Sequence, residues 1–192
     1  MTKSILLVGV GGQGTILAAK ILTLCLMEAG YDVKMSEIHG MSQRGGAVSS
    51  HVRYGEKVYS PVIEKGSADV LIAFEQMEAL RWLDYIKPQA KAVVNSLVIK
   101  PVPVLIGKAA YSDQILDEIR ARADATILDA QAEAIAVGNA RALNILLVGT
   151  AVKLMNLEGI DWNKIIAENV KPAFVEVNQK AFARGLELAA AM

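Results

Sequence analysis

The sequence predicts an α/β fold: a three-layer, mostly parallel, Rossmann-like sheet with helices on both faces and a helical C-terminal part. Three observations predict it. The apolar run Ile5–Val8 is closed by glycines and followed by apolar residues at helical spacing. Strand-like and helix-like segments alternate as far as Asp129, which favours a parallel sheet with right-handed crossovers. Beyond Asp129 the pattern is entirely helical.

The first half of the chain supplies four of the expected strands. The strand Ile5–Val8 leads into a helix over Gly14–Ala29, because apolar residues recur there at helical spacing. The next expected strands are Asp32–Ile38, Ala47–Tyr54 and Asp69–Phe74. The last of these leads into a helix that continues to about Tyr85.

The middle of the chain combines short strands with one helix. We expect a fifth strand at Ala92–Asn95 and a sixth at Ala125–Leu128. The segment Pro101-Val102-Pro103 favours an extended connection and argues against a helix there. A helix over Ser112–Ala123 is expected, with Ser112 as its N-cap and Asp113 in its first turn.

A C-terminal helix is expected to begin just after Pro172, a residue favoured in the first turn. Its apolar stripe closes the core or meets a partner. The stripe consists of Phe174, Val177, Ala181, Phe182, Leu188 and Ala189. No repeat, low-complexity tract or linker divides the chain, so residues 1–192 are expected to form a single domain.

Composition narrows the classes of function. The net charge is zero over 192 residues, so no global field attracts nucleic acid. The longest apolar stretch of the C-terminal half, Leu143–Leu157, is interrupted by Asn144 and Lys153 and is shorter than the ~20 residues of a membrane span. With no signal peptide expected either, a cytoplasmic location is predicted. The single cysteine, Cys25, allows no internal disulfide or cysteine-ligated cluster and is expected to be buried in a helix.

The turn after the first strand carries a phosphate-binding pattern. Gly9-Val10-Gly11-Gly12-Gln13-Gly14 fits G-x-G-x-x-G between a strand and a helix, the context that gives the pattern meaning. Free N–H groups at the helix start form a site for phosphate or pyrophosphate, to which Gln13 and Thr15 add side-chain donors. Glycines can also serve strand–helix packing alone, so a purely structural role stays open.

A second polar loop, His39 to Gly46, follows the next strand. Arg44 lies among its glycines, and a fixed fork of donors suits phosphate or carboxylate. The following strand has a polar face formed by Ala47, Ser49, His51 and Arg53. Residues 39–57 form a local cationic zone that suits an anionic partner. For the two histidines, ordinary hydrogen bonding is preferred over ligand contact or proton transfer, and two imidazoles alone make a poor metal site.

Other polar residues also follow expected strands. Ligands of open α/β sheets bind outside the carboxyl ends of the strands. Glu75-Gln76 and Asn95-Ser96 fall at such ends, and capping or turn roles are as plausible for Glu75 and Asn95 as ligand contact. Glu37 stands where a dinucleotide fold places an acid for a ribose hydroxyl, which makes an NAD- or FAD-binding protein a competing interpretation.

No complete catalytic apparatus is visible. The sequence contains no G-x-S-x-G elbow, no Walker A lysine after the glycines and no metal-ligand cluster at a convincing spacing. A chain with an anion cradle but no nucleophile or metal set is typical of a binding component of a larger enzyme.

Three segments together resemble a known family: Gly9–Thr15, Ser36–Gly46, and Ser60-Pro61 followed by Gly66–Asp69. They are similar to the small (beta) subunit of indolepyruvate:ferredoxin oxidoreductase and to the gamma subunit or domain of pyruvate and 2-oxoglutarate:ferredoxin oxidoreductases. The resemblance covers essentially the whole chain. The glycine motif recurs widely, whereas the Ser36–Gly46 run is specific, and its His-Gly-Met-Ser-Gln form favours the indolepyruvate branch.

The resemblance implies oxidative decarboxylation of aryl 2-oxoacids to aryl-acyl-CoA, with electrons passed to ferredoxin. It places thiamine diphosphate and [4Fe–4S] clusters on a large (alpha) partner subunit and associates the gamma-type domain with coenzyme A. No catalytic residue is then expected from this chain alone. The expected cofactor-binding residues are Gly9, Gly11, Gly12, Gln13, Gly14, Thr15, His39, Ser42, Gln43, Arg44, Gly45 and Gly46.

Alternatives remain beside the indolepyruvate subunit. They are a gamma subunit acting on pyruvate or 2-oxoglutarate, a stand-alone NAD- or FAD-binding protein, and a non-catalytic module that uses the fold only for assembly. A subunit isolated from its partner can form a homodimer through the face meant for that partner, in which case an exposed apolar patch is expected.

Overall fold

The computed structural model describes residues 1–40 and 45–191. Six strands form one sheet in the order β2-β3-β1-β4-β5-β6. Their bounds are β1 Lys3–Val10, β2 Asp32–His39, β3 Ala47–Gly55, β4 Ala68–Ala73, β5 Ile86–Asn95 and β6 Asp124–Leu128. Strand β3 pairs antiparallel with both β1 and β2, whereas β1, β4, β5 and β6 pair in parallel. Five of the six strands therefore point the same way, which confirms the mostly parallel sheet.

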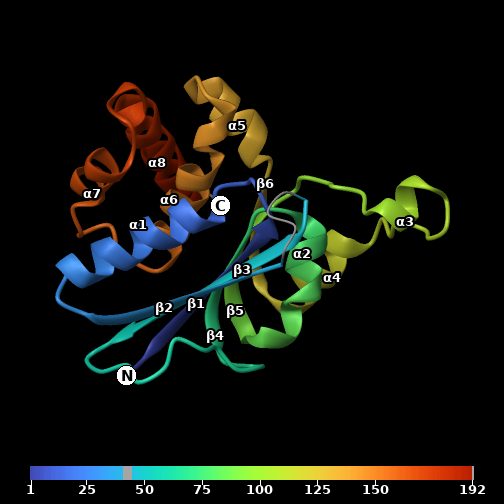
Figure 1. Ribbon diagram of the computed structural model, residues 1–192, viewed down its shortest axis with the longest axis horizontal. Coiled ribbons are helices and arrows are strands. Elements are labelled where there is room, and N and C mark those ends of the chain that lie inside the picture. Colours follow the sequence, from blue (N-terminus) through green and yellow to red (C-terminus); the bar gives the residue numbers. More distant parts are fainter. Residues whose placement is uncertain (41–44, 192) are drawn as a thin grey trace.

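Helices cover both faces of the sheet, as Figure 1 shows. Their bounds are α1 Thr15–Glu28, α2 Gln76–Arg81, α3 Val102–Leu105, α4 Ile115–Arg122, α5 Ala130–Val137, α6 Leu143–Leu154, α7 Trp162–Asn169 and α8 Val175–Ala190, with short 3-10 turns at Leu83–Tyr85, Ala140–Ala142 and Pro172–Phe174. Helices α1, α6, α7 and α8 lie on one face, and α2 and α4 lie on the other. The three layers predicted from the sequence are present. None of the described helices combines the length and apolar character that a bilayer crossing requires.

Alternate residues of β1 enter two different cores. Ile5 and Leu7 pack with the α1, α6 and α8 side, and Leu6 and Val8 pack with the α2 and α4 side. All four are fully buried. Side chains of successive strand residues point to opposite faces, so a strand covered on both sides is apolar throughout. This explains why Ile5–Val8 has no polar alternation.

The C-terminal helices cross at close range because two glycines face each other there. A Cβ on Gly149 of α6 would lie 2.2 Å from the carbonyl oxygen of Phe182, and one on Gly185 of α8 would lie 2.1 Å from that of Leu146. The predicted stripe on α8 closes the core at Ala181 and Phe182, with Phe182 stacked on Trp162. Phe174, at the stripe's start, stays 42% exposed.

Three expectations in the middle of the chain are wrong. The fifth strand begins at Ile86 instead of Ala92. Val102–Leu105 forms helix α3, with proline in its first turn, where no backbone N–H is needed and the fixed φ of proline suits a helix. The next helix begins at Ile115 instead of Ser112, because the Ser112 hydroxyl accepts a hydrogen bond from the nearby Gln114 N–H and closes a local turn.

Candidate functional site

The site begins where β1 ends and α1 starts. Gly14 occupies the N-cap position of α1 with φ 82°, and none of the described side chains caps this end. The first turn of α1 also lacks an acidic residue. The first N–H groups of a helix have no intrahelical partner and carry the positive end of its dipole. This end of α1 therefore offers free donors to an anion.

Two glycines hold the turn in shape for different reasons. Gly12 has φ 101°, but a Cβ there would meet nothing within 4 Å, so only the backbone conformation requires glycine. A Cβ at Gly14 would lie 2.6 Å from Nδ2 of Asn144. That amide comes from α6 and donates to the Gly14 carbonyl oxygen at 3.3 Å. Gly14 is thus constrained by both conformation and space.

Gln13, expected to contribute donors to a ligand, is engaged within the fold. Its Oε1 accepts from the Val10 N–H at 2.7 Å, and its Nε2 donates to the Phe74 carbonyl at 3.0 Å. The side chain therefore ties the end of β1 to the end of β4. Gly9 leaves room for it, because a Cβ there would lie 2.8 Å from Gln13 Oε1. A ligand contact from either residue stays a prediction.

Gly45 and Gly46, at the end of the second predicted loop, are hydrogen-bonded to the glycine turn. The Gly11 N–H donates to the Gly46 carbonyl at 2.8 Å, and the Gly45 N–H donates to the Gly11 carbonyl at 3.3 Å. Gly45 itself has φ 81°. Because β3 runs antiparallel, the loop returns at the same edge of the sheet where β1 ends. Two segments that the sequence singled out separately are thus joined. Ser42, Gln43 and Arg44 lie outside the described residues.

A cavity of about 390 Å³ lies between these segments. It is lined by Gly11, Gly12, Gly14, Thr15, Ile16, His39 and Val48. This volume is in the range of small-molecule sites. Thr15 is buried, and His39 is exposed, with its Nδ1 3.3 Å from the Gly40 carbonyl oxygen. The wall therefore combines backbone and polar groups on one side with the apolar side chains of Ile16 and Val48.

The predicted polar residues Glu75 and Asn95, at the ends of β4 and β5, are engaged in internal hydrogen bonds. Glu75, which is 1% exposed, caps α2 by accepting from the Glu78 N–H at 3.0 Å, and also accepts from the Ile99 N–H. Asn95 is fully buried; it donates to the Phe74 carbonyl at 3.1 Å and accepts from the Ala130 N–H at 3.1 Å. Of the two roles weighed from the sequence, the structure supports the capping and turn role for both residues.

The polar face of β3 is likewise structural. His51 is 3% exposed and its Nδ1 accepts from the Ile63 N–H at 3.0 Å, while its ring lies edge-on to Trp82. Burial lowers the pKa of His51, so the ring stays neutral near pH 7. Arg53 donates to the carbonyls of Ser60 and Val62. Arg53 and His51 thus hold residues 60–63 of the connection from β3 to β4, and they do not line the cavity.

Strand order weighs against the dinucleotide interpretation. In a dinucleotide fold the strand that carries the ribose-binding acid lies next to the first strand. Here β3 separates β2 from β1, so Glu37 lies one strand, or roughly 4.8 Å, farther along the sheet than that role requires. Within the described residues, Glu37 Oε1 and the Oγ of Ser50, its partner across β2 and β3, are buried without hydrogen bonds.

Comparison with known proteins decides the family. The pattern of the Pyruvate ferredoxin/flavodoxin oxidoreductase family matches residues 4–188. The chain belongs to this family. It is 37% identical over 197 residues to the Indolepyruvate oxidoreductase subunit IorB of Pyrococcus horikoshii, an alignment that covers 98% of this chain and 96% of that protein.

Solved structures of family members share the fold. A keto/oxoacid ferredoxin oxidoreductase gamma subunit from Geobacter sulfurreducens superposes with a TM-score of 0.73 at 26% identity, covering 99% of both chains. The 2-oxoglutarate:ferredoxin oxidoreductase of Magnetococcus marinus, described with 2-oxoglutarate, coenzyme A and succinyl-CoA bound, has a TM-score of 0.78 at 21% identity. This chain matches only 31% of that longer chain, so the fold occurs there as one part of a larger polypeptide.

The described part of this oxidoreductase subunit offers few side chains that could bind a metal ion or an iron–sulfur cluster. Cys25 is fully buried, and burial raises its pKa to about 12, which disfavours the thiolate that a cluster requires. Among the described residues, no group of three or more His, Cys, Asp or Glu side chains is placed to hold a metal ion.

The glycine turn Gly9–Gly14 together with Gly45 and Gly46 forms what we call the glycine edge of the sheet. Three residues beside it were missed by sequence reasoning. Ile16 and Val48 line the cavity, and Asn144 holds Gly14 from α6, 130 positions away. Asn144 had a detectable signal, because it is a buried polar residue inside an apolar helical run. Ile16 and Val48 had none, since apolar residues in a helix and a strand are ordinary core candidates.

Proposed function

We propose that this chain is the small subunit of an indolepyruvate-type 2-oxoacid:ferredoxin oxidoreductase. With a large subunit that carries thiamine diphosphate and [4Fe–4S] clusters, it serves the oxidative decarboxylation of aryl pyruvates to aryl-acyl-CoA, and ferredoxin takes up the electrons. The whole chain works as one gamma-type domain, and its glycine edge holds the phosphate-bearing part of coenzyme A.

One observation carries the proposal for the site. The turn after β1 and the loop after β2 are hydrogen-bonded to each other around a cavity at the uncapped start of α1. Anions bind at such helix starts through free N–H groups and the helix dipole. Coenzyme A carries a pyrophosphate and a further phosphate, so its chemistry fits donors that face a cavity without a nearby carboxylate in the first turn.

The site would use backbone N–H groups, one hydroxyl and apolar side chains for different parts of the ligand. The N–H groups of Gly12, Thr15 and Ile16 would bind phosphate oxygens, and Thr15 would add a hydroxyl. Val48 and Ile16 would exclude water from the apolar side of the ligand. Arg44, outside the described residues, would supply the charge. Coenzyme A, when bound, accepts the acyl group, and the groups of this chain orient it and move no proton.

The indolepyruvate branch is supported by similarity. Identity to the indolepyruvate oxidoreductase subunit is 37%, against 26% to the keto/oxoacid gamma subunit, with nearly complete coverage in both cases. Only 5% of the chain is aromatic, so a whole pocket for an indole ring is not built here, and substrate choice lies with the large subunit. Rates with indolepyruvate, pyruvate and 2-oxoglutarate, measured on the assembled enzyme, test this assignment.

The coenzyme A site is tested by calorimetry on the assembled complex with a matched pair of glycine variants. Gly12→Ala strains the glycine turn after β1, whereas Gly66→Ala strains a turn in the connection from β3 to β4. Both glycines have positive φ and open space for a Cβ. We expect Gly12→Ala to weaken coenzyme A binding about tenfold or more, and Gly66→Ala to leave binding unchanged. Equal affinities for the two variants would contradict the site.

Arg44→Ala tests the charge in the second loop. We expect a similar loss of affinity that shrinks at high salt, since salt screens the attraction between a guanidinium and a phosphate. Arg120→Ala on α4 is the control, because Arg120 is exposed and, among the described residues, pairs only with Asp117 on its own helix. Unchanged affinity of the Arg44 variant would remove this residue from the site.

A further inference from the structure

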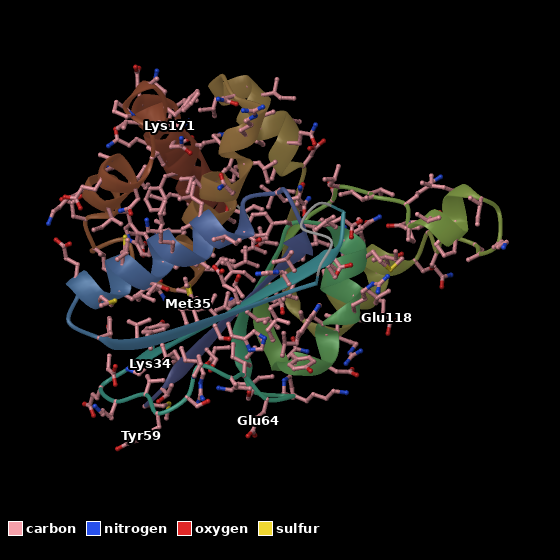
Figure 2. The ribbon with its side chains drawn as sticks, in the orientation of Figure 1. Lys34, Met35, Tyr59, Glu64, Glu118 and Lys171 are labelled. Atoms are coloured by element: carbon pink, nitrogen blue, oxygen red, sulfur yellow. The ribbon has the colours of Figure 1, made fainter. Side chains whose placement is uncertain are left out.

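Residues 98–110, which we call the arm, extend away from the body of the molecule. Figure 1 shows the arm, with α3 at its tip, reaching past α2 and α4 into open space. Helix α3 buries none of its residues. In Figure 2 the side chains of the arm stand away from the protein on all sides. Neither of the two cores therefore explains why this segment is apolar.

The exposed surface of the arm is apolar and positively charged. Its large side chains are exposed by 43% at Val98, 39% at Ile99, 65% at Val102, 68% at Leu105 and 57% at Ile106. Single exposed apolar residues are ordinary on soluble proteins, but five within nine positions mark an interaction surface. The arm also carries Lys100 and Lys108 and contains no acidic residue.

The arm is held at both of its ends by the start of α2. The Gln76 N–H donates to the Leu97 carbonyl at 3.2 Å, and Glu75 Oε1 accepts from the Ile99 N–H at 3.0 Å. At the other end, Gln76 Nε2 donates to the Tyr111 hydroxyl at 3.0 Å. The two anchor residues, Glu75 and Gln76, are buried. The base of the arm is consequently fixed to the sheet.

The tip of the arm is also well ordered by its own backbone. The Pro101 carbonyl accepts from Val104 and Leu105, and the Pro103 carbonyl accepts from Lys108 and Ala109. A segment that already has its bound shape loses little entropy on binding. An apolar projection whose backbone is hydrogen-bonded within itself suits insertion into a groove.

The base of the arm borders the glycine edge. A hollow of about 210 Å³ is lined on one side by Ile99, Lys100 and Val102 and on the other by Gly45 and Val10. A protein that encloses the arm would therefore cover the rim of the proposed coenzyme A site. This position is where a partner must stand if its chemistry is to reach a ligand held by the glycines.

We infer that the arm is the docking element for the large subunit of the same oxidoreductase and inserts into an apolar groove with an acidic rim. The inference rests on the proposed place of this chain beside a large subunit, and not on coenzyme A binding. Docking of a second copy on the arm is disfavoured by charge. A two-fold contact between arms brings the lysines of both copies together with no acid to offset them.

A pair of isoleucines with equal exposure provides the test. Ile106 on the arm and Ile135 on α5 are both 57% exposed. Affinity for the separately purified large subunit is measured by biolayer interferometry for Ile106→Asp and Ile135→Asp. We expect the arm variant to bind at least about tenfold more weakly and the α5 variant to bind as the unchanged chain does. Equal binding by both variants would overturn the inference.

Charge reversal tests the acidic rim without altering the apolar surface. The double variant Lys100→Glu and Lys108→Glu should bind the large subunit more weakly, and the affinity of the unchanged chain should fall as salt is raised. Light scattering of the isolated chain is the second measurement, and it reports whether the chain forms a homodimer. Loss of a homodimer in Ile106→Asp, with unchanged affinity for the large subunit, would assign the arm to a second copy and overturn the inference.

The two proposals fail separately in these experiments. If coenzyme A does not bind the glycine edge, calorimetry on the complex gives equal affinities for Gly12→Ala and Gly66→Ala, while the arm variants still weaken assembly. If the arm does not dock, the arm variants assemble normally while Gly12→Ala still changes coenzyme A affinity. Thermal unfolding of each variant checks whether the substitutions of exposed residues leave the fold intact.

Discussion

Polar residues follow the strands at both halves of the carboxyl edge of the sheet, but their hydrogen bonding differs between the ends of β4 and β5 and the ends of β1 and β2. At β4 and β5 the polar groups of Glu75 and Asn95 each find two partners within the protein. At β1 and β2 the glycine turn and His39 border a cavity, and the start of α1 has no described cap. A polar group at a strand end therefore indicates a ligand only when the protein leaves its hydrogen bonds unfilled.

The largest expected effect breaks the closed half. Asn95→Ala removes the donor to the Phe74 carbonyl and the acceptor for the Ala130 N–H, both in the interior. We expect the free energy of unfolding to fall by about 2–4 kcal/mol, because the buried Ala130 N–H loses its partner, the Phe74 carbonyl keeps only the bond from Gln13 among those described, and the lost amide leaves a cavity. Chemical denaturation measures the change. A loss below about 1 kcal/mol would mean that water or a shifted backbone replaces both bonds.

A smaller effect separates the two glycines of the open half. Gly14→Ala is expected to cost about 2–3 kcal/mol, since positive φ costs about 1–2 kcal/mol and Asn144 must also move. Gly12→Ala is expected to cost only about 1 kcal/mol, because its Cβ has open space. Denaturation of both variants measures the difference. Equal costs would show that Asn144 moves aside freely.

The smallest effect is a pH dependence in the closed region. Burial lowers the pKa of His51, so the unfolded chain takes up a proton more readily than the folded one. The stabilisation is present above the ordinary histidine value of 6.5 and is lost as pH falls through the lower, folded value. Denaturation between pH 7 and 5 measures it.

His51→Asn is the matched control for this pH dependence. Asparagine keeps an acceptor near Nδ1 for the Ile63 N–H but does not titrate. We expect the slope of stability against pH to flatten in this variant. An unchanged slope would assign the pH dependence to other groups.

Much of the fold could be predicted because the pattern along the chain is local. The strand bounds near Ile5–Val8, Asp32–Ile38 and Ala47–Tyr54 are confirmed to within two residues at each end, since buried strands reveal themselves by apolar runs and turns. Strand β5, however, starts at Ile86 and not at Ala92, because the sequence Lys87-Pro88-Gln89 interrupts the apolar pattern and proline is disfavoured in strands.

The order of the strands could not be predicted in the same way. The insertion of β3 between β1 and β2 depends on pairing across the sheet, which no local pattern encodes. That order brings Gly45 and Gly46 to Gly11 and removes Glu37 from the dinucleotide position. Gly11, Gly12 and Gly14 of the glycine turn line the cavity, and a ligand contact from them stays a prediction.

The carbonyl oxygen of Phe74 has a consequence for the time course of folding. It accepts from Gln13 across 61 positions of sequence and from Asn95 across 21. Contacts between distant positions form late, because the chain between them must first be ordered. We therefore expect the glycine turn to acquire its final shape only after β4 has joined β1. A nascent chain that ends before Phe74 is expected to lack the Gln13 bond that ties the turn to the sheet, and with it the shape of the proposed coenzyme A site.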